Sequence, residues 1–153
     1  MLGDGTKLLQ KDIKPFVRKA LINVWIGMNY NDDMMSGNKE TIKNVFNLLA
    51  DNAHYPIIWH CQAGADRTGV MTYLLNGLLG VSKEDLLRDY LLTNFAINDN
   101  SSRELAGIES KYVKTLDEYE GNTLSEKIYN YLNIEIGVST ENLDKIRDYM
   151  IEE

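Results

Sequence analysis

The sequence contains few of the residues that cross-link small proteins or bind metal ions. Its 153 residues include one cysteine and two histidines. A single cysteine excludes a disulfide within the chain and agrees with a reducing compartment, so we expect a cytoplasmic protein. His54 and His60 have no cysteine or carboxylate at the spacing of a zinc site. No metal and no other cofactor is therefore expected.

Basic residues and long apolar runs are also scarce. Lysine and arginine number 16 against 23 acidic residues, which gives a net charge of −7. This balance argues against nucleic acid and anionic membranes as partners. No stretch approaches the length of a membrane span, and no export signal opens the chain. With 44% hydrophobic and 25% charged residues, residues 1–153 are expected to form one soluble domain.

The only cysteine lies in a short polar segment between two apolar ones. An apolar run at 55–59 precedes it, and a helix-like run at 69–75 follows. The order predicts a strand, a tight loop and a helix start, in which backbone N–H groups converge to form an anion site. The segment reads His60-Cys61-Gln62-Ala63-Gly64-Ala65-Asp66-Arg67-Thr68-Gly69.

This loop predicts phosphoryl transfer to Cys61. The field of the loop and helix lowers the pKa of a thiol at the first position, which makes Cys61 a nucleophile. Arg67 can hold two phosphate oxygens with its planar fork. His60 would orient the loop, and the backbone amides of the intervening residues would bind phosphate, with glycine where the turn is tight. These amides belong to Gln62, Ala63, Gly64, Ala65, Asp66 and Arg67. A buried structural cysteine beside an unrelated arginine is the ordinary alternative.

The pattern His-Cys, five residues and Arg-Thr-Gly resembles the phosphate loop of the cysteine-dependent protein tyrosine phosphatase superfamily, with Gly69 as its last residue. The loop is most similar to that of the atypical bacterial and fungal tyrosine phosphatases, which usually carry lysine at the position of Ala65. The Asp66–Arg67 pair is also similar to myotubularin-type lipid phosphatases. The resemblance covers roughly Lys39 to the C-terminus, including segments 85–94 and 137–150.

The leaving group needs a proton, so a carboxylic acid is expected near the loop. The resemblance implies an aspartate from an upstream loop, and Asp32 and Asp33 lie 29 and 28 residues before Cys61. Asp66 is the rival, because myotubularin-like enzymes are thought to use an aspartate there. A solvated turn or a loop-stabilising acceptor is the structural alternative for these residues. Thr68 either donates its hydroxyl to the thiolate or merely starts a helix.

Apolar periodicity and turn residues predict an α/β fold, with a tyrosine-phosphatase-like core, a small and mainly parallel sheet flanked by helices, and a helical C-terminal half. Asn38, Ser82, Thr123 and Ser139 are expected helix caps, and Gly80 a helix stop. The expected strands are 21–26 and 57–61, and the expected helices are 39–52, 68–79, 82–96, 101–119, one after Thr123 and one after Ser139.

Only 60 residues precede Cys61, fewer than the resemblance implies. The N-terminal strands are therefore expected to be reduced or missing, either because the chain is truncated or because the sheet is small. A short sheet exposes an edge that can pair with a second copy, so a homodimer stays open.

The predicted function is metal-independent hydrolysis of a phosphomonoester, with phosphotyrosine in a protein as the leading substrate. A phosphoinositide or small phosphate ester is the enzymatic alternative, and a phosphate-binding module without turnover is the third. Met34 and Met35 are expected to pack in the core instead of forming a lid. Tyr30, Tyr55, Trp25 and Trp59 are expected to be mostly core, with a pocket wall as the alternative.

Overall fold

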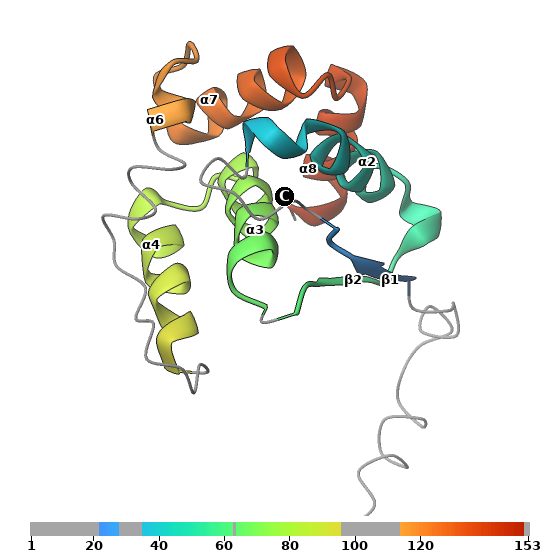
Figure 1. The fold of residues 1–153 in the computed structure, drawn as a ribbon. Coiled ribbons are helices and arrows are strands. Elements are labelled where there is room, and N and C mark those ends of the chain that lie inside the picture. The colour runs from blue at the N-terminus through green and yellow to red at the C-terminus, as the bar shows by residue number, and fades with distance from the viewer. Residues whose placement is uncertain (1–21, 28–34, 63, 96–113, 152–153) are drawn as a thin grey trace, which may run out of the picture.

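The computed structural model describes residues 22–27, 35–62, 64–95 and 114–151 (Figure 1). Tyr30, Asp32, Asp33, Met34, Ala63 and residues 101–113 of the helix expected over 101–119 lie outside the described residues. The elements are β1 (Ile22–Trp25), a 3₁₀ turn (Ser36–Asn38), α2 (Lys39–Leu49), a 3₁₀ turn (Asn52–His54), β2 (Ile57–His60), α3 (Asp66–Leu78), α4 (Lys83–Leu92), a 3₁₀ turn (Thr93–Phe95), α6 (Lys114–Asp117), α7 (Leu124–Asn130), a π-helical turn (Tyr131–Glu135) and α8 (Thr140–Met150).

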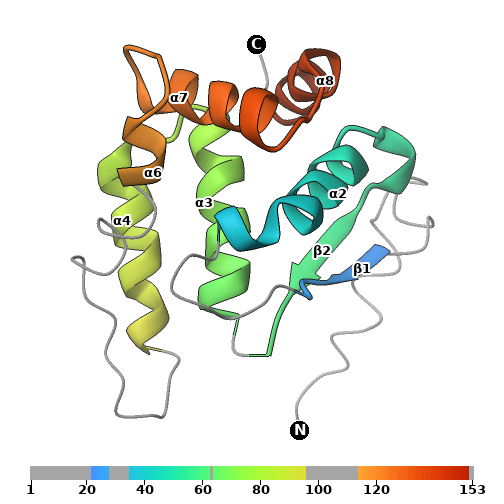
Figure 2. The same ribbon diagram turned by 45° about the horizontal axis from the view of Figure 1, so that its top comes forward.

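The two strands form a parallel pair, which confirms the predicted small parallel sheet. The register runs from Ile22 opposite Ile57 to Trp25 opposite His60. Parallel strands require a crossover connection, and α2 lies in it, over the sheet in Figure 2. Because side chains alternate along a strand, Ile57 and Trp59 face the core. Trp25 and Ile58 keep about half of their surface exposed (55% and 47%).

The core lies between the helices and one face of the sheet. α3 packs against α7 and α4, and α2 packs against α8. Figure 2 shows α3 in the middle of the molecule, with α4 on one side and α2 and α8 on the other. The largest fully buried side chains include Phe46, Leu74, Leu78, Ile128 and Tyr131. Met35 is also buried, as expected, so it packs in the core and forms no lid.

Several helix ends confirm the predicted signals. Thr123 and Glu126 form a reciprocal capping box at the start of α7, and Ser139 caps α8. Gly80 has a φ of +90°, and the N–H of Val81 donates to the carbonyl of Asn76 at 3.0 Å, which closes the end of α3. In the described part of the chain, no helix is both long enough and apolar enough to cross a membrane.

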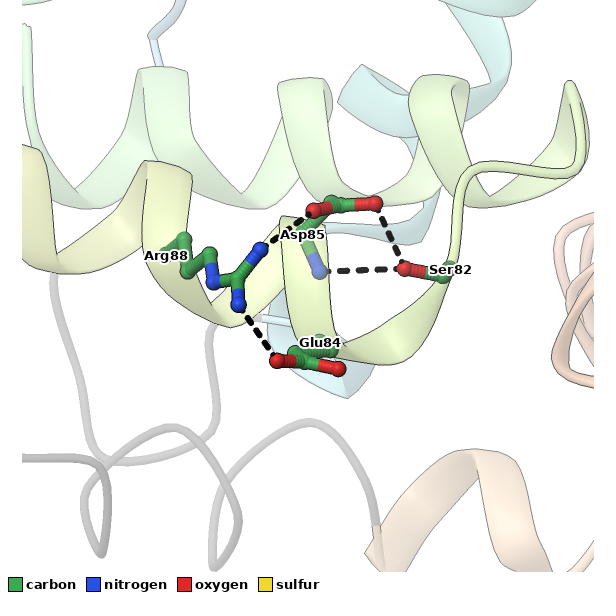
Figure 3. A network of polar contacts seen from close by, with 4 residues as sticks. All are labelled: Ser82, Glu84, Asp85 and Arg88. Carbon is green, nitrogen blue, oxygen red and sulfur yellow. Dashed lines mark hydrogen bonds and ion pairs between the residues drawn. The ribbon is translucent and has the colours of Figure 1, made fainter.

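The start of α4 differs in detail from the predicted capping box. Ser82 accepts a hydrogen bond from the N–H of Asp85 at 3.2 Å, as expected (Figure 3). The Asp85 carboxylate accepts from the Ser82 hydroxyl at 2.7 Å, whereas the reciprocal bond of a capping box runs to the backbone N–H. The Arg88 guanidinium donates to Asp85 at 3.2 Å and to Glu84 at 2.5 Å. Arg88 therefore pairs with both carboxylates of the first turn.

Two helix starts depart from the prediction. Asn38 makes no side-chain cap of α2, because a 3₁₀ turn leads directly into the helix. α3 begins at Asp66 and not at Thr68, because the N–H of Gly69 already donates to the carbonyl of Ala65 at 2.9 Å. Asp66 and Arg67 therefore lie in the first turn of the helix.

Gly77 sets how closely α3 approaches α7. A Cβ atom at Gly77 would overlap Cδ1 of Ile128, a fully buried side chain. We expect Gly77→Val to lower the free energy of unfolding by about 1–3 kcal/mol through overpacking, measured by urea denaturation. Asn76→Val places the same side chain at the neighbouring, half-buried position of α3 and controls for helix propensity. Equal stability of the two variants would contradict this account of the contact.

Candidate active site

The loop predicted to bind phosphate joins β2 directly to α3. β2 ends at His60 and α3 begins at Asp66, so five residues make the connection. Gly64 has a φ of +71°, a left-handed conformation that glycine adopts without strain. No atom of the described residues lies within 4 Å of the position where its Cβ would be. Backbone conformation, and not lack of space, is therefore the reason for glycine here.

The start of α3 has no side-chain cap. Its N-cap residue is Ala65, whose methyl group cannot accept a hydrogen bond. In contrast, Ser82, Thr123 and Ser139 each accept a backbone N–H at the starts of α4, α7 and α8. An α-helix leaves its first backbone N–H groups without carbonyl partners inside the helix, and its dipole places partial positive charge there. The N-terminus of α3 can therefore bind the oxygens of an anion.

Cys61 lies at the junction of β2 and the loop. Its side chain is buried, with 7% of the residue exposed. The carbonyl of the preceding residue, His60, accepts a hydrogen bond from the N–H of Ile26 at 2.8 Å, which extends the pairing of the strands to the edge of the loop. The sheet thus fixes the backbone immediately before the cysteine.

Three side chains from three elements meet beside this loop. The Arg67 guanidinium carbon lies 5.8 Å from the ring centroid of Trp25, within the range of a cation–π contact. The rings of Trp25 and His60 meet edge to face, with centroids 5.2 Å apart. Trp25 is therefore a residue of the candidate site and not of the core. In the sequence, Trp25 can be recognised as a site residue by its position at the end of a predicted strand. Parallel strands end at the same edge of a sheet, so Trp25 lies beside the residues at the end of β2.

Two other aromatic residues, Trp59 and Tyr55, are expected mostly in the core and lie away from this loop. Trp59 points to the core side of the sheet, and its indole N–H donates to the Thr72 hydroxyl at 3.3 Å. Tyr55 precedes β2, at the opposite end of the strand from Cys61, and its hydroxyl donates to the carbonyl of Leu49 at 2.8 Å. Burial, with a smaller effect from Tyr149, raises the pKa of Tyr55 to about 12, so this phenol stays a donor.

The hydroxyl of Thr68 has no hydrogen-bond partner within the described ranges, although its oxygen is buried. A bond from this hydroxyl to the Cys61 sulfur is therefore not formed in this structure. A buried hydroxyl without a partner carries a desolvation cost of about 1–3 kcal/mol.

The structure describes one of the three candidate acids. Asp66 lies in the first turn of α3, next to Arg67, and is partly buried. Asp32 and Asp33 lie outside the described residues. Over the described ranges, no group of three or more histidine, cysteine or carboxylate side chains could hold a metal ion.

The tyrosine phosphatase family model matches residues 24–152 of this chain. The match begins in β1, runs through the loop and α3, and ends after α8. Because it covers most of the sequence, the chain belongs to the tyrosine phosphatase family. This match confirms the resemblance to the tyrosine phosphatase superfamily. The parallel strand pair and its flanking helices confirm the expected α/β class.

Shorter segments are similar to two curated phosphatases. A tyrosine-protein phosphatase of Nostoc commune is 37% identical over 51 residues, which make up 33% of this chain and 17% of that protein. The triple specificity protein phosphatase PtpB of Mycobacterium tuberculosis is 30% identical over 77 residues, 50% of this chain and 27% of that protein. The aligned part thus spans less than a third of either relative.

We expect Trp25 to hold Arg67 for anion binding. An exposed cation–π contact contributes about 0.5–1 kcal/mol, so Trp25→Leu should weaken the binding of orthovanadate about two- to fivefold, measured by calorimetry. Trp25→Phe keeps an aromatic face and should lose less. Trp59→Phe, a change of the core-facing tryptophan, serves as the control. If Trp25→Leu binds vanadate as tightly as the unchanged chain, the contact has no part in anion binding.

Proposed function

We propose that this chain hydrolyses phosphomonoesters through a phosphocysteine intermediate, with phosphotyrosine in proteins as the leading substrate class. The observation that carries the proposal is the direct connection from β2 through Cys61 to the uncapped start of α3, with Arg67 in its first turn. Nucleophile, backbone donors and guanidinium come from one short stretch of chain. Membership of the tyrosine phosphatase family supports the same chemistry.

In the first step, the Cys61 thiolate attacks phosphorus. A bond forms between sulfur and phosphorus while the bond from phosphorus to the ester oxygen breaks, and the leaving oxygen takes a proton from a carboxylic acid. The backbone N–H groups at the start of α3 and the Arg67 guanidinium stabilise the charge on the three other phosphate oxygens. The positive end of the helix favours the thiolate form of Cys61 before the attack.

In the second step, water attacks phosphocysteine. The carboxylate that gave up its proton takes one from the water, and the bond between sulfur and phosphorus breaks to release phosphate and the thiolate. In this step the Thr68 hydroxyl, which has no partner in the described part of the structure, donates to the departing sulfur. A donor to sulfur stabilises the negative charge that returns to it.

The phosphotyrosine assignment rests on the resemblance of the loop and on charge. The net charge of −7 disfavours an anionic membrane surface. A protein substrate avoids the repulsion that a layer of anionic lipid would meet.

The central test is hydrolysis of p-nitrophenyl phosphate in EDTA. The unchanged chain should turn over this ester and be inhibited by vanadate, whereas Cys61→Ser should show only background release of nitrophenol. Arg67→Ala should lose about a hundredfold to a thousandfold in kcat, as expected for removal of a donor to the transition state. Arg147→Ala, on the distant helix α8, is the matched control and should retain activity.

Two results would oppose the proposal in different ways. Turnover by Cys61→Ser would exclude the thiolate as nucleophile. Vanadate binding without any turnover, in a folded chain, would identify a phosphate-binding module. Circular dichroism of each variant separates loss of function from loss of fold.

The general acid can be assigned by the leaving group. Removing the acid should slow phenyl phosphate more than p-nitrophenyl phosphate, because nitrophenolate departs without a proton. If Asp66 is the acid, Asp66→Asn should lower kcat about a hundredfold or more on phenyl phosphate, with a much smaller effect on the nitrophenyl ester. The same pair of substrates applied to Asp33→Asn and Asp32→Asn tests the upstream candidates. Equal losses on both esters would exclude the substituted residue as the acid.

A further inference from the structure

A cavity of ≈ 360 Å³ lies between α3 and α4 and adjoins the candidate phosphate site. Gly64 and Ala65 of the loop form part of its wall. α4 contributes Leu86, Asp89 and Leu92 from the opposite side. Figure 2 shows the two helices side by side over their length. Since the loop is shared, a molecule whose phosphate occupies the loop brings its neighbouring groups to this cavity.

The wall of the cavity combines apolar and polar groups. Leu86 and Tyr73 are buried, with 3% and 4% exposed, whereas Leu92 keeps 59% of its surface exposed. The hydroxyl of Thr72 also lines the cavity and accepts the Trp59 indole N–H. An exposed leucine beside a polar opening provides apolar surface that the hydrocarbon part of a ligand can cover.

Asp89 gives this cavity its charge. Two other carboxylates of α4, Glu84 and Asp85, share an ion pair with Arg88. The exposed Asp89 side chain has no ion pair and no hydrogen bond to any other described residue. A negative charge thus lies at the cavity, next to the loop that is proposed to bind a negatively charged phosphate. A ligand that satisfies both sites carries a positive charge beside its phosphate.

We propose that this cavity is a substrate subsite that takes a lysine or arginine side chain adjacent to the phosphorylated residue. The aliphatic stem of a basic side chain covers Leu92 and the apolar wall, and its charged end pairs with Asp89. The inference rests on the proposed phosphatase function and narrows its substrate to phosphotyrosyl segments with a basic neighbour.

The test compares three phosphotyrosyl peptides that differ in the residues flanking phosphotyrosine. These residues are arginine, glutamine or leucine on both sides. Binding is measured by calorimetry on Cys61→Ser, so that the result does not depend on turnover. We expect the arginine peptide to bind about two- to fivefold more tightly than the glutamine peptide at low salt, and the difference to shrink as salt rises.

Substitution of Asp89 should abolish this preference. Asp89→Asn in the Cys61→Ser background should bind the arginine and glutamine peptides equally, and Asp89→Lys should prefer a peptide with flanking glutamate. Asp148→Asn makes the same change of charge on α8, on the opposite side of α3 from α4 (Figure 2), and should keep the preference for arginine.

Three outcomes would overturn the proposal. The arginine peptide could bind no better than the glutamine peptide, or the leucine peptide could bind as well as the arginine peptide. The preference for arginine could also survive in Asp89→Asn. Hydrolysis of p-nitrophenyl phosphate by the unchanged chain, a substrate with no basic group to pair with Asp89, reports on the phosphatase function separately. Intact turnover without a preference for the arginine peptide would therefore exclude the subsite and leave the phosphatase function unaffected.

Discussion

The five-residue connection between β2 and α3 is the constraint on which the candidate site depends. A strand and a helix joined by so short a loop must place the end of the strand next to the start of the helix. His60, directly before Cys61, is the last residue held by the sheet, and Arg67 is one of the first held by the helix. The left-handed Gly64 allows the chain to reverse between them. Cys61 and the proposed anion site thus lie together because the backbone has little freedom to separate them.

The helices behind the loop supply the rigidity that this arrangement needs. α3 is held along its length by α7 and α4, and Gly77 lets Ile128 pack directly on the helix backbone. The buried residues of α3, from Val70 to Leu78, hold this helix in the core. Both the stability of the core and the position of the first-turn amides therefore depend on how α3 is packed. This link makes α3 both the centre of the fold and the support of the site.

Much of the architecture could be predicted from the sequence, because local signals dominate there. The strand before Cys61, the helix after it and the caps at Ser82, Thr123 and Ser139 depend on residues within a few positions of each other. The sequence pattern predicts that α3 begins at Thr68, two residues after its observed start at Asp66, because no capping residue marks the start of this helix. The exposure of Trp25 was also missed, because apolar composition in a strand does not reveal which face the sheet covers.

Residues 60–69 are enough to predict the chemistry of the site, because they combine a cysteine, a glycine turn and an arginine at the spacing of a strand–loop–helix connection. Apolar periodicity and turn residues likewise predict the α/β class. What surrounds the loop follows from tertiary packing. The register of β1 on β2 brings Trp25 to Arg67, and the packing of α4 on α3 brings Asp89 to a cavity beside the loop. These neighbours come from separate elements, and their proximity follows from packing that no local pattern encodes.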